Sequence, residues 1–536
     1  MAIRAPFRPG SNLSRSLALC SALTVVLTAS LSGSAWAHHG PPGFLTPQPA
    51  MLTPLAPRSS VLPIITVGET LKKSGYRFEA IPDGIGFGLP GKKSVSIYVN
   101  HETSTVPFPY NPQNPNPDNS QNDFDNAQLS ALTLSLKNAG VLSGQLVIPS
   151  SANYQRFCSN FLIGPREGFH RPLLITNEET SDLVNRTGMA WPPGPEAEQA
   201  GLAVAFDPFT GEYRPIYGLG RMNHENSVPV PGYRKTVLLT GDDTFAAPSS
   251  QLYMYIARDR DAVWNDRGHL YGLISNDPAI NDYGDLSGQI SVSGRFVQVP
   301  DAIANGDQNG LESWSNENNV FQFIRVEDIA YDRNTPNIVY FADTGEPRAI
   351  PDPDTGRLKR GPAGTMGPWP NGRIFKMVLD RHDPTLVRSL SILVDADLGG
   401  YNNPAVLHQP DNIETTRRSL LVLEDPGGHN QYPAADPAGT TARVWRYDLA
   451  TGAFTAVARV DQSQDPGQDA NQGSWESSGI VDASAAFGRG AFLINVQAHT
   501  LFVETAPGPD LVPPPGPDWL YKREGGQLLL LRIPGA

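Results

Sequence analysis

The chain of 536 residues carries 41 Lys and Arg against 54 Asp and Glu, and its formal net charge is −13. Charged residues make up only 18% of the chain, while Gly and Pro contribute 51 and 50 residues, which argues against a coiled coil or a protein of long helices. No cluster of basic residues is present, so the sequence gives no sign of a nucleic-acid-binding surface. The composition favours a β protein whose short strands are separated by turns.

Residues 1–37 have the pattern of a secretory signal peptide. Three arginines precede the apolar run Leu17–Leu31, and Ala35–Ala37 supplies the small residues of a cleavage site. A retained membrane anchor is the alternative, but the run is shorter than the roughly 18–20 residues that span a bilayer. Lipid attachment at Cys20 is disfavoured because the large Leu19 precedes it. We therefore expect an exported protein, periplasmic or extracellular, with no membrane span.

Cleavage of this segment would remove Cys20 and leave Cys158 as the single cysteine, so no intrachain disulfide is expected. We expect Cys158 itself to pack as a small apolar residue. An acidic exported protein is poorly suited to DNA or anionic membranes, because like charges repel, and is well suited to divalent cations.

After the signal peptide, a Pro-rich leader over residues 38–59 is expected to be unstructured, and residues 60–536 are expected to form one domain. Short apolar runs of strand type recur through this domain and alternate with turn clusters. The runs are Val95–Val99, Leu132–Leu136, Leu173–Thr176, Thr236–Leu239, Ile338–Phe341, Leu420–Leu423 and Phe492–Val496.

A second kind of strand, rich in aromatic residues, recurs at Leu252–Ile256, Arg373–Asp380 and Arg443–Leu449. Bulky strands followed by Asp and a Gly-containing turn, repeated at irregular spacing, favour the blades of a β-propeller with insertions. A set of β-sandwich domains is the alternative, but a closed radial repeat better explains one long all-β chain without obvious linkers. The prediction is therefore an all-β fold, a six-bladed β-propeller with long loop insertions.

Acidic residues gather where these strands begin or end. The acidic phrases are Asn100–Glu102, Asn177–Glu179, Gly220–Glu225, Arg325–Asp328, Pro410–Asn412, Glu424–Asp425 and Trp475–Gly479. Carboxylate and amide oxygens that converge from several loops form the site that Ca²⁺ prefers, and arginines beside them would clamp phosphate or carboxylate. For any one phrase a solvated loop charge is the alternative, but recurrence at successive strand junctions favours a shared site.

Three familiar catalytic patterns are missing from the sequence. Gly-rich pieces such as Asp83–Gly88 do not match a phosphate loop or a dinucleotide fingerprint. There is no G-x-S-x-G nucleophile elbow, and there is no H-E-x-x-H or Cys/His zinc spacing. Any chemistry is therefore expected to depend on the acidic phrases.

The order of these motifs resembles that of the PhoX-type alkaline phosphatase family, secreted phosphatases built on a β-propeller. Each matching phrase is weak alone, whereas the series in the same order is specific for the superfamily, and it extends over residues 75–500. The phrases are Ile81–Gly84, Asn100–Glu102, Arg156–Cys158, Asn177–Glu179, Gly220–Glu225, Thr240–Asp243, Leu252–Tyr253, Trp264–Tyr271, Arg325–Asp328 and Pro410–Asn412.

The resemblance implies a phosphomonoesterase whose channel holds calcium ions and an iron pair, with arginines that neutralise the phosphate. The residues that correspond by position to metal ligands are Asn177, Glu178, Glu179, Glu225, Glu327 and Asp411. The residues that correspond to the catalytic phosphate clamps are Arg156 and Arg325.

Three features depart from the family pattern. Family phosphatases place a Cys, a thiolate ligand to iron, directly before the paired glutamates, where this chain has Asn177. A neutral amide cannot replace an anionic soft ligand at iron, though it can serve calcium. In addition, Ala498 separates a Gln and a His that the family keeps adjacent, and the signal segment lacks the twin Arg of proteins exported already folded around iron. We therefore expect calcium rather than iron.

The sequence predicts an exported calcium-binding propeller that hydrolyses phosphate esters, a PhoX-like phosphatase acting as a monomer on a small anionic substrate. Two alternatives remain open. One is a non-catalytic calcium-binding propeller that lost the iron site. The other is a calcium-dependent lactonase or esterase, against which the two arginines argue.

Overall fold

The computed structural model describes residues 40–107, 121–244, 250–401, 403–426, 440–467, 472–508 and 519–536. The predicted signal peptide, residues 1–37, lies outside the described residues. Within the part of the chain that is described, no helix is long and apolar enough to cross a membrane.

Six blades of antiparallel strands make up most of the described residues. The first blade has the strand order β3 (Pro82–Phe87), β4 (Ser94–His101), β6 (Gln128–Ser135) and β7 (Val141–Ile148). The second has β8 (Phe157–Ile163), β9 (Leu173–Glu178), β12 (Ala203–Phe206) and β13 (Tyr213–Ile216). The third has β14 (His224–Pro229), β15 (Thr236–Asp242), β16 (Leu252–Ala257), β17 (Gly268–Ser275) and β18 (Ser291–Gln298).

The remaining three blades complete the series. The fourth has β19 (Val326–Tyr331), β20 (Ile338–Asp343), β23 (Arg373–Leu379) and β24 (Leu386–Asp395), and its β24 pairs with β18 of the third blade. The fifth has β25 (Pro410–Thr415), β26 (Ser419–Glu424), β27 (Arg443–Asp448), β28 (Phe454–Val460) and β1 (Leu52–Pro54). The sixth has β29 (Glu476–Asp482), β30 (Ala491–Pro507), β31 (Leu520–Arg532) and β2 (Ser60–Thr66).

Short elements lie outside this framework. The strand β5 (Gln121–Asp123) pairs in parallel with β31, and two small hairpins are formed by β10 (Leu183–Val184) with β11 (Glu198–Gln199) and by β21 (Ala349–Pro351) with β22 (Leu358–Arg360). The described α-helices are α1 (Arg260–Trp264), α2 (Asp301–Ala304), α3 (Gln308–Glu317) and α5 (Ser484–Phe487).

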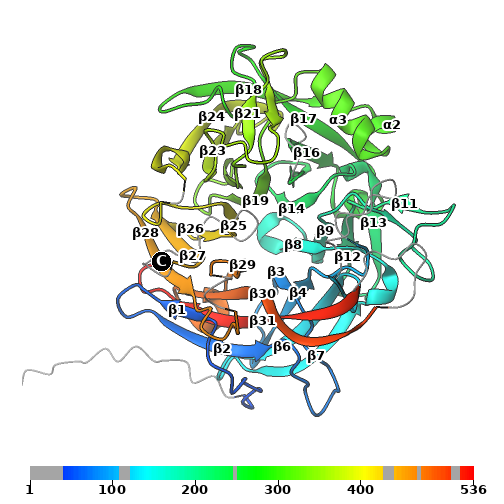
Figure 1. Cartoon of the computed structure of the whole chain (residues 1–536), viewed down its shortest axis with the longest axis vertical. Helices are drawn as coiled ribbons and strands as arrows, with labels where there is room; N and C mark the ends of the chain where they lie inside the picture. The colour runs from blue at the N-terminus through cyan, green and yellow to red at the C-terminus, as the bar shows by residue number, and fades with distance from the viewer. Residues whose placement is uncertain are drawn as a thin grey trace, which may run out of the picture. The chain divides into compact units, whose positions relative to one another are not determined.

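The first strand of each blade lies at the centre of the molecule. The innermost strands β3, β8, β14, β19, β25 and β29 contact one another in a closed ring, so the sixth blade returns to the first (Figure 1). Radial closure of this kind leaves only short sheet edges open to solvent. The prediction of an all-β propeller is confirmed.

The N-terminal segment closes the ring. As the outer strand of the sixth blade, β2 pairs with β31, which joins the two ends of the described chain in one sheet. Within the Pro-rich leader, β1 pairs with β28, and Phe44 forms an isolated bridge with Val141. The expectation that residues 38–59 are unstructured therefore fails for this segment. Its prolines are compatible with pairing because an edge strand needs hydrogen bonds on one side only.

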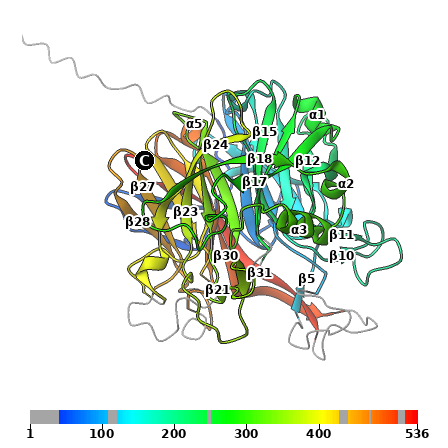
Figure 2. The same ribbon diagram turned by 90° about the horizontal axis from the view of Figure 1, so that it is seen from above.

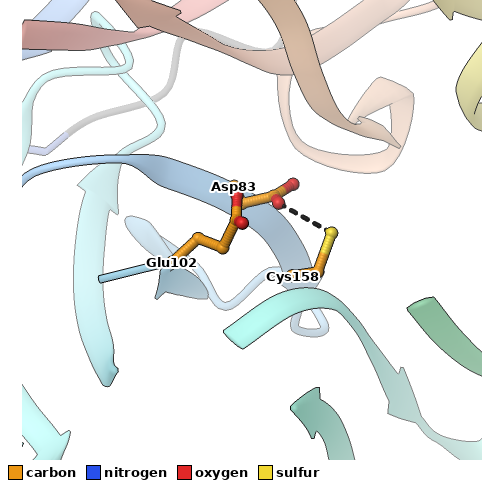
Figure 3. A group of neighbouring side chains, drawn as sticks. All are labelled: Asp83, Glu102 and Cys158. Carbon is orange, nitrogen blue, oxygen red and sulfur yellow. Dashed lines mark hydrogen bonds between the residues drawn. The ribbon is translucent and has the colours of Figure 1, made fainter. Parts of the chain in front are cut away.

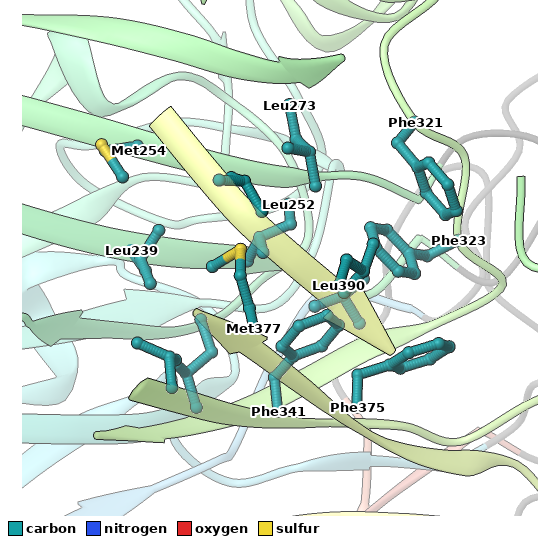
Figure 4. Packing of buried hydrophobic residues seen from close by; sticks show 14 of the residues in the cluster. Leu239, Leu252, Met254, Leu273, Phe321, Phe323, Phe341, Phe375, Met377 and Leu390 are labelled. Atoms are coloured by element: carbon teal, nitrogen blue, oxygen red, sulfur yellow. The ribbon is translucent and has the colours of Figure 1, made fainter. Parts of the chain in front are cut away.

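Apolar side chains of neighbouring blades pack together. Between the third and fourth blades, Leu239 and Leu252 belong to one buried cluster with Phe341 and Phe375 (Figure 4). The rings of Phe341 and Phe375 stack with their centroids 5.1 Å apart. This packing fixes the blades relative to one another and so fixes the inner strands that line the channel.

Candidate metal centre in the central channel

Every innermost strand carries a β-bulge near its start. The register against the second strand of the blade shifts between Pro82 and Ile85, Phe157 and Asn160, His224 and Ser227, Val326 and Ile329, Pro410 and Ile413, and Ser478 and Ile480. In five of the six blades the irregular stretch has two residues, and the first is acidic or a cysteine: Asp83, Cys158, Glu225, Glu327 and Asp411. Bulges re-aim side chains, and here the same device is repeated around the channel.

A second set of acids follows the second strand of several blades. Glu102 comes directly after β4, Glu179 after β9, Asp243 after β15 and Asp425 after β26. The sixth blade adds Glu476 at the start of β29. Because second strands run back toward the bulges, these residues arrive at the same end of the channel.

Apart from Asp243, which binds Arg325, the two sets meet in four groups that share members. Within each group, one potential ligand atom of every residue lies within 4.8 Å of the others. The groups are Asp83, Glu102 and Cys158; Cys158, Glu179 and Glu225; Glu225, Glu327 and Asp411; and Asp411, Asp425 and Glu476. The shared residues link all four into one channel cluster of nine side chains, to which every blade contributes.

The thiol of Cys158 lies inside this channel cluster (Figure 3). It donates a hydrogen bond to Asp83 Oδ2 at 3.0 Å, and it belongs to both the first and the second group. Cys158 is buried, as expected, but among carboxylates and not in an apolar environment. A thiolate at this place would be a soft ligand next to hard oxygen ligands.

Burial and mutual repulsion raise the pKa of the cluster acids. Burial, followed by the neighbouring Glu102, raises the pKa of Asp83 to about 7. The pKa values of Glu179 and Glu327 are raised well above the usual range by burial and then by Asp243. Ionised carboxylates cannot stay this close in a buried site without protons or cations to offset their charge. The channel cluster is thus suited to binding several metal ions.

Of the other predicted ligands, Glu178 lies outside the four groups, and both Asn177 and Glu178 are held by hydrogen bonds. Asn177 donates to the backbone oxygen of Ser159 at 3.1 Å and accepts from Ser227 Oγ at 2.8 Å. Both oxygens of Glu178 bind the guanidinium of Arg186, at 2.8 and 2.9 Å, and both also accept backbone N–H groups. The contacts of Glu178 hold segments of the second blade together and those of Asn177 reach β8 and also β14 of the third blade, whereas Glu179, one residue after Glu178, reaches the channel.

The predicted clamps Arg156 and Arg325 both lie beside the channel cluster. Arg325 binds Asp243 in a bidentate fashion, with Nε–Oδ1 at 2.8 Å and Nη2–Oδ2 at 2.5 Å, and approaches Glu327 at 3.2 Å. Arg156 lines a cavity of about 180 Å³ together with Glu102, His499 and Lys522.

An extension of the sixth blade forms one wall of this small cavity. The strands β30 and β31 continue past the other strands of their blade, and β5 joins β31 there (Figure 2). His499 Nδ1 lies 2.8 Å from Glu524 Oε2, and Lys522 Nζ lies 2.5 Å from Glu524 Oε1. The lining therefore places three cationic or basic side chains, Arg156, His499 and Lys522, beside the three acids Glu102, Asp123 and Glu524.

Sequence reasoning assigned Glu179, Glu225, Glu327 and Asp411 as ligands, and the structure brings these four into the channel cluster. It did not assign five other members: Asp83, Glu102, Cys158, Asp425 and Glu476. All five stood in phrases already recognised as motifs. The missing signal was the position within a blade: the bulge for Asp83 and Cys158, the residue after the second strand for Glu102 and Asp425, and the start of the innermost strand for Glu476.

No protein-family model matches this chain, and no curated protein matches it. Among solved structures, it is similar to PhoX of Pseudomonas fluorescens in complex with vanadate, a transition state analogue. That likeness has a TM-score of 0.57 and 17% sequence identity, and it covers 91% of this chain and 98% of PhoX. Weaker likenesses are an α-L-arabinanase of Penicillium chrysogenum (TM-score 0.38, 8% identity, 88% of this chain and 98% of that one) and the nidogen/laminin complex (0.33, 10%, 78% and 94%). The comparison with PhoX supports a PhoX-like propeller fold.

Proposed function

We propose that this protein is an exported, metal-dependent hydrolase of phosphoric esters. The observation that carries the proposal is the channel cluster, in which eight carboxylates and one thiol from all six blades meet beside Arg156 and Arg325. A PhoX-like fold is consistent with this chemistry. The signal-peptide pattern of residues 1–37 supports export.

The groups of the channel cluster differ in the metal that they favour. The group of Glu225, Glu327 and Asp411 offers only oxygen ligands, which suit calcium. The group of Cys158, Glu179 and Glu225 adds a soft sulfur ligand, which suits iron better than calcium. The amide of Asn177 was the reason to expect no iron, but that amide is hydrogen-bonded to Ser159 and Ser227, and Cys158 lies within the groups. We therefore include iron in the proposal.

The substrate phosphate would enter through the small cavity beside Glu102. Arg156 and Lys522 line this cavity and would bind non-bridging phosphate oxygens, a task for which a planar guanidinium is well shaped. Metal ions in the channel would polarise the phosphoryl group and offset the charge that develops on it. The cavity of about 180 Å³ is below the roughly 300–1,000 Å³ usual for small-molecule sites, so we expect small phosphate monoesters.

The test measures metal content and turnover on the same purified protein. Protein prepared without added metal is analysed for calcium and iron, and activity is measured on p-nitrophenyl phosphate before and after chelation. We expect bound metal, activity that chelation removes, and recovery when the removed metals are returned. Activity that is indifferent to chelation would contradict the proposal.

A non-catalytic calcium-binding propeller is the second candidate. It is favoured by Arg325, because the guanidinium is held by Asp243 and Glu327 and so has a structural role within the cluster. The two candidates differ in one outcome. Protein that is fully loaded with metal and still releases no p-nitrophenol would support this second candidate.

A further inference from the structure

A second cavity lies on the other side of the bulges from the channel cluster. This distal cavity has a volume of about 670 Å³ and is lined by residues of all six innermost strands. Its lining includes the second residue of several bulges, among them Gly84, Ser159, Asn226 and Asp328. The first residue of each of these bulges belongs to the channel cluster.

A hydrogen-bonded septum separates the two sites. Asn226 Nδ2 donates to Asp328 Oδ1 at 2.5 Å, and Asp328 Oδ2 accepts the N–H of Ile413 at 3.0 Å. Asn412 Nδ2 donates to Ser159 Oγ at 3.0 Å, and its Oδ1 accepts the N–H of Gly479 at 2.5 Å. The bond from Asn412 to Ser159 joins the fifth blade to the second, and the other three join neighbouring blades, so hydrogen-bonded bulge residues lie between the distal cavity and the channel cluster.

Apolar and aromatic side chains form a large part of the distal cavity's wall. Phe87 and Tyr98 come from the first blade, Phe161 and Leu162 from the second, and Val481 from the sixth. All five are half-buried, so part of each side chain remains available to a ligand. The volume lies within the roughly 300–1,000 Å³ that is usual for sites that bind small molecules.

Charged groups of the distal cavity are predominantly negative. The acids are Glu167, Asp328, Glu414 and Asp482, and the bases are Arg166 and Arg333. Arg333 is already held by Glu414 at 2.8 Å and lies over the ring of Tyr331 at 4.5 Å. An incoming anion would therefore meet more negative than positive charge and be repelled. A cation would be attracted both by the carboxylates and by the faces of the aromatic rings.

Asp482 is the acid best placed to meet a ligand. It is half-buried, and its Oδ1 accepts a hydrogen bond from the N–H of Ser484 at 2.9 Å. Its backbone N–H donates to Glu414 Oε2 at 3.1 Å, which fixes the position of the residue in the wall. Asp328 and Glu414 are buried, in the septum and beside Arg333, and the side chain of Glu167 is 6% exposed and accepts a hydrogen bond from the Tyr331 hydroxyl.

We propose that the distal cavity is a binding site for a small organic cation with an aromatic or apolar body, separate from the channel cluster. The ammonium group binds at Asp482, and the apolar body packs against Phe87, Phe161 and Val481. The site takes a ligand of opposite charge to the phosphate ester proposed for the channel, so it is not an extension of the substrate site.

The test uses three probes that share a phenylethyl body and differ in charge. Binding of 2-phenylethylamine, 2-phenylethanol and 3-phenylpropanoate to the whole protein is measured by calorimetry. We expect the amine to bind at least fivefold more tightly than the alcohol, and the anion to bind most weakly. A smaller preference, the reverse order, or no saturable binding by the amine would overturn the proposal.

Variants locate the binding site on the protein. Asp482→Asn keeps the Oδ1 acceptor and removes the charge, so the fivefold preference for the amine is expected to disappear. The exposed Asp354 serves as the control, and Asp354→Asn is expected to leave the preference for the amine over the alcohol unchanged. Inorganic phosphate, a probe of the channel cluster, is expected not to displace the amine, and displacement would count against two separate sites. If Asp482→Asn fails to fold, the probe series on the unmodified protein still decides the proposal.

Discussion

Neighbouring residues in a bulge have different surroundings. Cys158 contacts the carboxylates of the channel cluster, whereas Ser159 accepts a hydrogen bond from Asn412 in the septum. In the same way, Glu225 is a member of the cluster and Asn226 bonds across to Asp328. One position in the chain thus separates a potential metal ligand from a side chain that holds the blades together.

Replacing Cys158 tests whether the thiol is a metal ligand. In Cys158→Ser, the soft ligand is lost and the oxygen-only groups remain, so iron content is expected to fall severalfold while calcium content is retained. Elemental analysis of the purified variant measures both metals. Unchanged iron, or equal loss of the two metals, would contradict the assignment.

Asn177 provides a matched control for this prediction. Its amide nitrogen and oxygen are each engaged in a buried hydrogen bond, to Ser159 and Ser227. Asn177→Ala is therefore expected to lower the free energy of unfolding by about 1–3 kcal/mol, the cost of leaving buried partners unsatisfied. The metal content should stay at the level of the unmodified protein, which elemental analysis checks together with chemical denaturation.

Lys522 is predicted to contribute to substrate binding. Its ammonium is held 2.5 Å from Glu524 in the wall of the small cavity, where it would attract a phosphate. In Lys522→Gln we expect KM for p-nitrophenyl phosphate to rise about tenfold with a smaller change in kcat, and Lys522→Arg should recover most of the loss. The exposed Lys137 serves as the control, and Lys137→Gln should leave both constants unchanged. A fall in kcat alone would place Lys522 elsewhere in the mechanism.

At the scale of elements, the short strand β1 shows how the Pro-rich leader is fastened. Leu52 is 2% exposed and packs in a cluster with residues of the fifth and sixth blades, whereas Leu55, just after the strand, is 45% exposed. Leu52→Ala is expected to lower the free energy of unfolding by about 2–5 kcal/mol, and Leu55→Ala by no more than about 0.5 kcal/mol. Denaturant titration of the two variants measures the difference. Equal, small effects would mean that the leader is not part of the folded unit.

The strands could be predicted from sequence, but the bulges could not. Runs such as Val95–Val99 and Leu420–Leu423 alternate or are continuously apolar, and both lie in strands of the structure. A bulge depends on the register between two strands, which no local pattern records. This is why Cys158, which occupies in the second blade the bulge position that Glu225 has in the third, stood in a recognised motif but was not assigned as a ligand. The leader was missed for a related reason, because its partners lie about 400 residues away in β28.

At the scale of the whole molecule, the closed ring brings together acids that are distant in sequence. Asp83 and Glu476 are almost 400 residues apart, yet both face one channel because the sixth blade packs against the first. The formal net charge of −13 is therefore not spread evenly over the surface but is partly concentrated at the axis. Stability of the fold should consequently depend on what neutralises the channel.

In the metal-free protein, two sets of buried groups make the stability of the fold depend on pH in opposite directions. Burial lowers the pKa of His101, His224 and His408 to about 4, so the unfolded state binds more protons below pH 6.5 and these groups favour unfolding as the pH falls. Burial raises the pKa of seven channel acids, so the native state binds more protons and stability falls as the pH rises above about 4. These acids are Asp83, Glu102, Glu179, Glu225, Glu327, Asp411 and Glu476.

Because the seven acids outnumber the three histidines, chelated protein is expected to become less stable as the pH rises from 5 to 8. Bound metal ions hold the carboxylates in their ionised form, so the native state no longer takes up extra protons and this loss should disappear. The measurement is the melting temperature across this pH range, with a chelator and with added calcium. Chelator should lower the melting temperature by more at pH 8 than at pH 5. Parallel curves under the two conditions would show that the channel acids are not neutralised by metal.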